Sequence, residues 1–325
     1  MSNVDNRTIL DDIVSASGIG RPNSALTDIF WGLDHQGVGT LFPKNSDEQG
    51  MLLVTRPRMN LSHDNVTGVQ KLTPLLSDDR QSIYRAIRCM LDPIIGAQIG
   101  SDLFDIKQAF IPIITNTCIS CTGWPEATMN YYTSPEGIRK EVWSMADDVA
   151  ELNGTYQLTM NFANTRGDPV SKLMLPWVTY QGAVYTGDMT PYPEHSMLRE
   201  MDYWGRIWRI VLSEDKRYVS KIGCMIGAVP MADSTGAFMD YNREDGGIRN
   251  MDQISIPFHC LWAEYDVPVL LEEFNLTVCM FNGAMRDGSR QATYRKMTPF
   301  ELATTGSMRG YPHIDLVTRE ITWWI

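Results

Sequence analysis

Several features that would assign this chain to a common functional class are missing from its sequence. No apolar run approaches the about 20 residues that a membrane-spanning helix needs, and the opening residues (MSNVDNRTILDD) show no basic stretch followed by an apolar one. We therefore expect no membrane partner and no secretory signal. Positive charge is scarce: 28 Lys and Arg stand against 39 Asp and Glu. The net charge of −11 argues against a protein that grips nucleic acid, but not against one that nucleic acid slides past. The same acidity is equally well explained as a means of keeping the protein in solution.

Catalytic and metal-binding patterns are also missing. There is no nucleophile elbow, no phosphate loop and no complete dinucleotide-binding glycine motif. The five histidines are isolated, and Cys118 and Cys121 form a lone Cys-X-X-Cys with no second ligand pair for zinc. The Gly123-Trp124-Pro125 sequence that follows opposes the helix that a redox motif needs. We expect no cofactor, no metal and no enzyme activity; a hydrolase starting from His63 and Asp64 is the remote alternative.

What the chain does contain is typical of a globular protein that assembles. Its 325 residues are 43% hydrophobic and 21% charged, enough for two ordinary domains or one large one. The six cysteines, in a chain with no visible signal, predict reduced thiols in a protein made in the cytoplasm. Nineteen Met, nine Trp and thirteen Tyr favour a surface rich in contacts as well as an ordinary core.

The first half of the sequence is irregular. Residues 1–50 are rich in Gly, Asn, Asp and Ser and predict an extended N-terminal arm. Residues 51–150 predict a mixed α+β region, with a buried strand over 51–55, a short helix over 81–89 and an apolar run over 109–114 that is broken by proline.

The second half, residues 151–325, is patterned and predicts a β-rich domain. From Gly154, alternating apolar residues predict a strand, and Asp168 and Pro169 predict the cap and start of a helix that Pro176 should kink or shorten. A similar strand–turn–helix module follows from Ile254, in which Pro257 predicts an edge position or a bulge. Residues 205–224 between the modules predict a β-hairpin. The predicted class is α+β with mostly antiparallel strands.

Four side chains are candidates for contacts between subunits. Arg56 and Arg58 flank a proline after the first strand, where each is either a surface charge or a bidentate anchor for a carboxylate on a neighbour. Trp323 and Trp324 lie in a C-terminus that is apolar to its last residue, which predicts docking in the core or on a partner.

Several short segments resemble virion structural proteins of large contractile-tailed bacteriophages. They are residues 52–61 (LLVTRPRMNL), 110–116 (FIPIITN), 123–125 (GWP), 132–137 (YTSPEG), 164–169 (NTRGDP), 202–211 (DYWGRIWRIV) and 227–230 (GAVP). No catalytic residue belongs to this resemblance. The strand–turn–helix module starting at Gly154, its similarity to the module from Ile254, and the acidic charge resemble tail-tube and tube-initiating baseplate proteins.

The resemblance implies a β-sandwich or barrel with flanking helices and a structural role in the virion. It implies homo-oligomeric rings, with a hexamer favoured, in contact with other tail and baseplate proteins. DNA would then be a partner only in passing through an acidic lumen. The alternatives are a neck, tail-terminator, sheath-associated or capsid-decoration protein.

Overall fold

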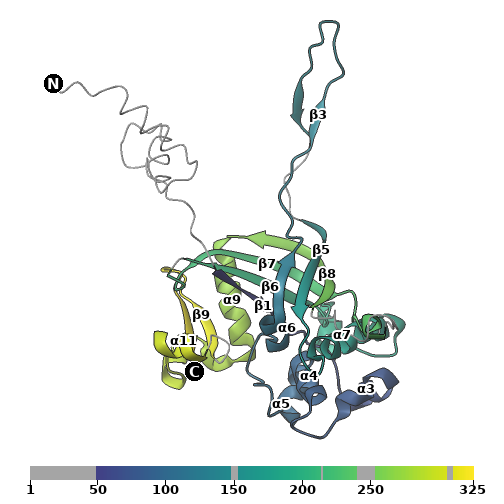
Figure 1. Ribbon diagram of the computed structural model, residues 1–325, viewed down its shortest axis with the longest axis vertical. Helices are drawn as coiled ribbons and strands as arrows, with labels where there is room; N and C mark the ends of the chain where they lie inside the picture. The colour runs from purple at the N-terminus through teal and green to yellow at the C-terminus, as the bar shows by residue number, and fades with distance from the viewer. Residues whose placement is uncertain (1–48, 148–152, 214, 240–252, 306–309) are drawn as a thin grey trace, which may run out of the picture. The chain divides into compact units, whose positions relative to one another are not determined.

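The computed structural model describes residues 49–147, 153–213, 215–239, 253–305 and 310–325. Its main feature is one six-stranded sheet in the order β1-β6-β7-β8-β5-β2, in which every neighbouring pair is antiparallel (Figure 1). Its strands are β1 (Gln49–Val54), β2 (Cys118–Thr122), β5 (Asn153–Ala163), β6 (Gly205–Leu212), β7 (Val219–Pro230) and β8 (Gln253–Tyr265). The predicted α+β class with mostly antiparallel strands is confirmed. Strands from both predicted regions, 51–150 and 151–325, belong to this sheet, and the N-terminal arm predicted for residues 1–50 lies outside the described residues except at its last two.

The sheet curls until its two edge strands approach each other. Residues 50–52 of β1 and 118–121 of β2 line the same cavity, of about 490 Å³, although the two strands do not pair. Helix α6 (Pro112–Thr117), which leads directly into β2, packs on β1 and helps to fill the seam. The sheet is therefore a nearly closed barrel with flanking helices, as the tail-tube resemblance implied.

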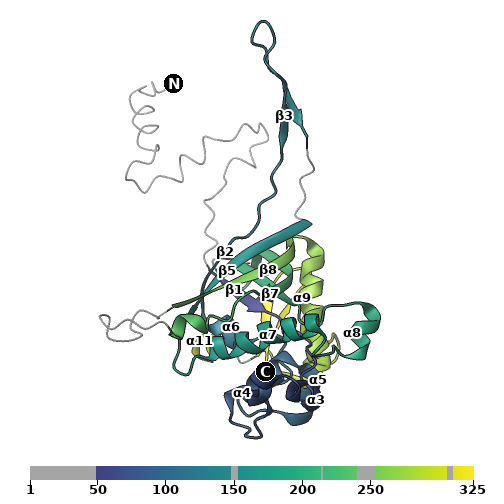
Figure 2. The ribbon, with the colours of Figure 1, turned by 90° about the vertical axis from the view of Figure 1, so that its right-hand side faces the viewer.

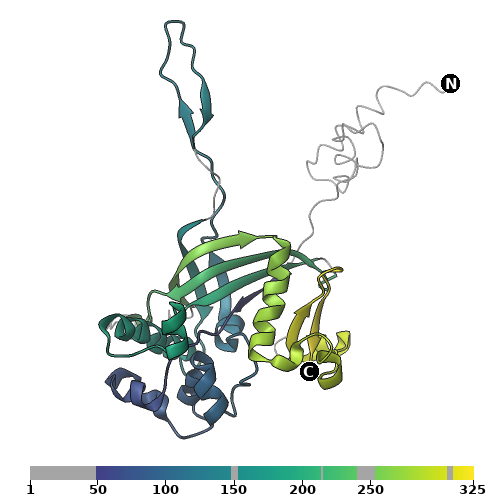
Figure 3. The same ribbon diagram turned by 180° about the vertical axis from the view of Figure 1, so that it is seen from behind.

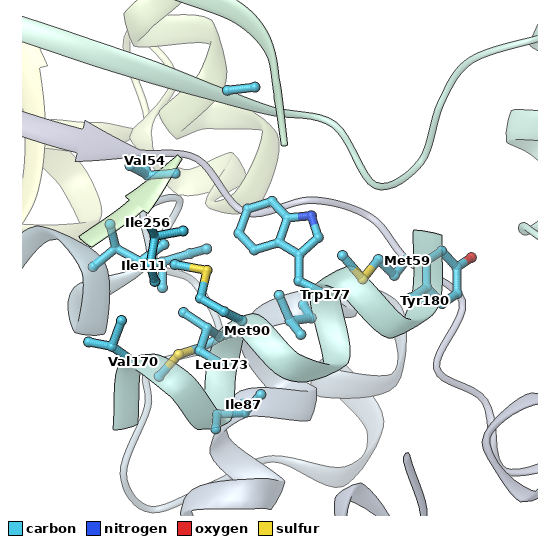
Figure 4. Packing of buried hydrophobic residues seen from close by; sticks show 14 of the residues in the cluster. Val54, Met59, Ile87, Met90, Ile111, Val170, Leu173, Trp177, Tyr180 and Ile256 are labelled. Carbon is cyan, nitrogen blue, oxygen red and sulfur yellow. The ribbon is translucent and has the colours of Figure 1, made fainter. Parts of the chain in front are cut away.

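One face of the sheet is covered by α7 (Pro169–Thr186), and α4 (Ile83–Leu91) packs on α7 farther from the sheet, as Figure 2 shows. Alternate residues of β5 and β8 point into this core because side chains alternate across a strand. The labelled members of the cluster in Figure 4 are Val54, Met59, Ile87, Met90, Ile111, Val170, Leu173, Trp177, Tyr180 and Ile256. Burying the indole of Trp177 contributes about 3 kcal/mol of transfer free energy. The helix runs through Pro176 without ending, so the predicted shortening is wrong.

The opposite face is covered by α9 (Pro268–Phe281), as Figure 3 shows, together with the hairpin of β9 (Tyr311–Ile314) and β10 (Ile321–Trp324). Trp208 and Phe274 meet here edge to face, with ring centroids 5.4 Å apart. Trp208 and Ile210 of β6 face this core, whereas Ile207 faces the first one. The sheet is therefore buried on both faces.

Both strand–turn–helix modules are present, as β5–α7 and β8–α9, but Asp168 does not cap its helix as predicted. Asp168 has a left-handed backbone (φ +50°), and its side chain makes no capping hydrogen bond. A capping side chain normally acts from an extended backbone, so the left-handed turn takes Asp168 out of that role. Asp266 shares this conformation and accepts a hydrogen bond from the N–H of Ile222 on β7 at 2.8 Å.

Pro257 corrects another prediction, because it lies in β8, an interior strand, where it pairs with Thr159 without a register shift. Its carbonyl accepts from the N–H of Met231, one residue beyond the end of β7. In an antiparallel ladder the N–H and C=O of one residue point to the same neighbour. The side of Pro257 that lacks an N–H therefore faces the end of β7. The interior strand β8 tolerates proline there because β7 ends at Pro230.

The remaining elements are short. Strands β3 (Tyr131–Thr133) and β4 (Ser144–Ala146) form a separate two-stranded sheet. The helices are α3 (His63–Thr67), η1 (Gln70–Leu76), α5 (Pro93–Ile99), α8 (Pro193–Leu198), η2 (Gly236–Met239), η3 (Gly283–Met285), α10 (Arg290–Thr293) and α11 (Pro299–Thr305). No helix among the described residues is long and apolar enough to cross a membrane.

Candidate assembly surface

Arg56 follows β1 and is only 3% exposed. Its guanidinium lies between the rings of Phe104 and Phe281, at 4.9 and 5.0 Å from their centroids. Burial lowers the pKa of Arg56 to about 10, so it stays charged at neutral pH. Its donors bond the carbonyl oxygens of Met90 (3.0 Å), Ile106 (2.7 Å), Gln108 (3.0 Å) and Cys89. Arg56 thus joins β1 to the end of α4 and to the chain that leads to α6.

Arg58, two residues later, has a different environment. It lies against Met280 of α9, at the rim of a cavity of about 460 Å³ that we call the α9 cavity. The cavity lies between α9, the start of β6 and the residues that follow α8. Arg58 is a partly exposed cation there, within reach of another molecule.

Two nearly buried polar groups lie at the α9 cavity. Asp202 is 3% exposed; its Oδ2 accepts from the hydroxyl of Tyr180, whereas its Oδ1 has no hydrogen-bond partner among the described residues. Burial is the main cause that raises the pKa of Asp202. Tyr180, whose hydroxyl donates to this carboxyl, belongs to the core that contains α7. His195 Nδ1 lies 3.4 Å from Glu200 Oε2 without a well-aligned hydrogen bond.

The β3–β4 hairpin, residues 131–146, is the most exposed part of the described chain, and we call it the arm. Every residue in it except Ser134 is exposed. Its large apolar side chains are Tyr131, Tyr132, Ile138, Val142, Trp143 and Met145. The rings of Tyr132 and Trp143 contact each other edge to face across the two strands, with centroids 6.2 Å apart. Because these side chains are exposed, the hairpin presents apolar surface that its own subunit does not cover. A two-stranded hairpin is also only marginally stable alone in water.

The C-terminal tryptophans lie in and beside the second core. Trp323 is 4% exposed and belongs to the cluster under α9. Trp324 is partly buried, with the guanidinium of Arg290 over its ring at 5.1 Å. The C-terminus is therefore docked in a core. Contacts of Arg56, Arg58, Trp323 and Trp324 with a neighbouring subunit stay a prediction, which the exposed setting of Arg58 fits best.

A family model described as "Putative phage tail tube protein" matches the whole chain, residues 1–325. The chain belongs to this tail tube family. The predicted resemblance to phage tail proteins is thereby confirmed, and the family describes a structural component of the tail.

Solved structures from contractile injection systems are similar to parts of this tail tube family member. They are the anti-feeding prophage cap (AFP tube terminating cap), and the sheath-tube complex and the sheath/tube terminator of PVC, an extracellular contractile injection system, both in the extended state. The identities are 10%, 8% and 8%, and the TM-scores 0.29, 0.26 and 0.24. Each covers 49% of this chain and, in the same order, 83%, 84% and 89% of the other chain. No curated protein matches the sequence. With TM-scores below 0.5, these likenesses add nothing to the family match.

The four candidate catalytic or metal-binding residues, which are His63, Asp64, Cys118 and Cys121, lie outside the arm and the lining of the α9 cavity. His63 and Asp64 are exposed on α3, and His63 Nδ1 lies 3.9 Å from Asp64 Oδ1. Cys118 and Cys121 lie on the edge strand β2, where burial raises their pKa values to about 11 and 12, which disfavours the reactive thiolate. No group of three or more His, Cys, Asp or Glu suited to a metal ion occurs among the described residues.

Sequence reasoning missed the arm and the α9 cavity. The arm had a usable signal, because Tyr131 and Tyr132 precede a Pro135-Glu136-Gly137 turn and Trp143 follows it. The cavity had none, since its walls come from segments more than 200 residues apart in the chain, from Arg58 to Met280.

Proposed function

We propose that the chain is a ring-forming structural subunit of the tail tube of a contractile-tailed phage, in which the arm contacts a neighbouring copy. The exposed apolar surface of the arm is the observation that carries this proposal. Six large apolar side chains, three of them aromatic, lie on a hairpin with almost no buried residue. Aromatic side chains of this kind dominate interface energetics once a partner covers them.

The favoured ring is a hexamer around a DNA passage, as the tail-tube resemblance implies. The net charge of −11 supports an acidic lumen, because like charge keeps phosphates from sticking to the wall. Identical subunits close into a ring when the rotation of a heterologous contact closes. The position along the tail, in the tube shaft or where the baseplate starts the tube, is part of the proposal. So are other tail and baseplate proteins as partners.

Electron microscopy of the purified protein over a concentration series tests this. We expect sixfold rings or stacked tubes from the native chain, and particles that remain single subunits from the triple variant Tyr131→Ser/Tyr132→Ser/Trp143→Ser. Long stacked tubes favour a shaft subunit, whereas isolated rings favour a subunit that starts or ends the tube.

Tyr185→Ser is the matched control, since Tyr185 is 92% exposed on α7, outside the arm. It should assemble as the native chain does. Rings that form equally well from the triple variant would remove the arm from the proposal. A native chain that stays monomeric at every concentration, also with phage tails added as templates, would contradict the tube function.

A further inference from the structure

The α9 cavity is lined by apolar and charged side chains together. Four large apolar side chains on its rim, Met201, Trp204, Leu276 and Met280, are each between 39% and 59% exposed. Scattered exposed apolar residues are ordinary, but four around one cavity of about 460 Å³ form a contiguous patch of the kind that marks interaction sites. An occupant of this cavity should therefore bring an apolar side chain.

The charges of the cavity define the occupant further. Four arginines line it against three carboxylates, and burial favours the neutral form of one of these, Asp202. Arg206 is paired with Glu273 at 2.8 Å. Arg58 and Arg199 have no carboxylate partner within the described ranges. The occupant should bring carboxylates for these two arginines, and a donor for Asp202 Oδ1.

We propose that the α9 cavity receives the tip of the arm of a second copy of this chain, which rests on the proposed function that copies assemble through the arm. Ile138 at the tip is wholly exposed, so it is not seated in the cavity of its own subunit. The tip also carries Glu136 and Glu141 as acceptors and Arg139 and Lys140 as donors. The arm as a whole, residues 131–146, carries these two carboxylates and two cations, so it can bring carboxylates to Arg58 and Arg199 and a donor to Asp202.

The tip is ordered before it meets a partner. The N–H of Gly137 donates to the carbonyl of Glu141 at 3.0 Å, and the N–H of Lys140 donates to the carbonyl of Gly137 at 2.9 Å. The N–H of Arg139 donates to Glu141 Oε2 at 2.8 Å. A turn held in this way loses little conformational entropy on insertion, which favours binding.

Cysteine crosslinking between two full-length chains tests the proposal. One chain carries Ile138→Cys and the other Leu276→Cys, both at exposed positions, and a short bismaleimide is added to the mixture. Burial raises the pKa of each of the six native thiols, which disfavours the thiolate that reacts with a maleimide. A mixture of native chains measures the background crosslinking from these thiols. We expect a crosslinked heterodimer from this mixture and none above background when Tyr185→Cys replaces Leu276→Cys.

The charge of Arg58 gives a second readout in the same mixture. Arg58→Glu on the Leu276→Cys chain should lower the heterodimer yield about tenfold or more, because like charges at an interface cost several kcal/mol. Arg58→Lys keeps the charge and should retain most of the yield. An unchanged yield with Arg58→Glu would overturn the role of the arginine rim.

Microscopy of the same samples separates this proposal from the tube function. Rings without the Ile138–Leu276 crosslink would overturn the cavity as the seat of the arm and leave the tube function standing. The crosslink without rings would support arm docking and contradict ring formation. Neither crosslinks nor rings, or equal crosslinking to the Tyr185→Cys control, would overturn the cavity proposal.

Discussion

Arg56 and the β3–β4 arm are opposite exceptions to the usual pattern of burial, since Arg56 is a buried charged residue and the arm carries exposed apolar ones. Arg56 is buried, and carbonyl oxygens and aromatic rings of its own subunit surround it. The arm is exposed almost throughout, and its six large apolar side chains have little cover. The difference separates residues that build the subunit from residues that we propose join subunits. It also implies that substitutions in the two regions should change different measurements.

Within this comparison, the largest effect on the stability of the subunit is expected from substitution of Arg56. Arg56→Ala should lower the free energy of unfolding by about 3–5 kcal/mol, because it leaves several buried carbonyl groups without donors and opens a gap between two rings. Arg56→Lys should recover only part of the loss, since an ammonium group cannot reach carbonyls in several directions at once. Urea unfolding of each variant measures this.

Arg58 supplies the control for that experiment. It lies two residues away but is partly exposed at the cavity rim, so Arg58→Ala should change the free energy of unfolding by less than about 1 kcal/mol. Equal losses for the two arginines would show that Arg56 is not a special structural contact, and the contrast between buried body and exposed arm would lose its clearest example.

His313 on β9 gives a smaller effect that depends on pH. Burial, with a smaller contribution from Arg290, lowers the pKa of His313 from 6.5 to about 4, while Asp287 and Asp315 act in the opposite direction. The fold therefore favours the neutral imidazole, and its contribution is complete above the unfolded pKa. It is lost as pH falls from about 6.5 towards 4, and the loss is at most about 3 kcal/mol.

Denaturant unfolding at pH 7 and pH 5 tests this against His313→Gln. The native chain should lose more stability between the two pH values than the variant does, because the variant cannot take up the proton. An equal loss of stability in both proteins would assign the pH dependence to other groups and would contradict the lowered pKa of His313.

The sequence predicts the strands of the second half well because their signal is local. Leu158, Met160 and Phe162 alternate with polar residues, and all three are buried in one core. Pairing is not local: Leu53 meets Trp208 across 155 residues, and no pattern at either position specifies that partner. Pro257 was misplaced for the same reason, because an interior position that tolerates proline depends on where a different strand ends.

The candidate site was harder to predict than the fold. Arg56 and Arg58 are equivalent in sequence terms, since both flank Pro57, and only the three-dimensional packing buries one and exposes the other. The aromatic content indicated a surface rich in contacts, but not that Tyr131, Tyr132 and Trp143 share one exposed hairpin while Trp177 and Trp208 fill cores. Burial depends on the whole fold, so composition could not separate the two groups.

The smallest effect on subunit stability is expected from the arm, and it sharpens the comparison most. Tyr131→Ser, Tyr132→Ser and Trp143→Ser should each change the free energy of unfolding of the isolated chain by no more than about 0.5 kcal/mol, because these side chains are already exposed. Trp177→Ala, which empties a buried indole site under the sheet, should cost about 3–5 kcal/mol. Urea unfolding under conditions that keep the chain monomeric measures both. If the arm substitutions destabilise the monomer as much as Trp177→Ala does, the arm packs on its own subunit in solution and is not free to join another. If they leave the monomer unchanged and stop assembly, their apolar surface acts between copies.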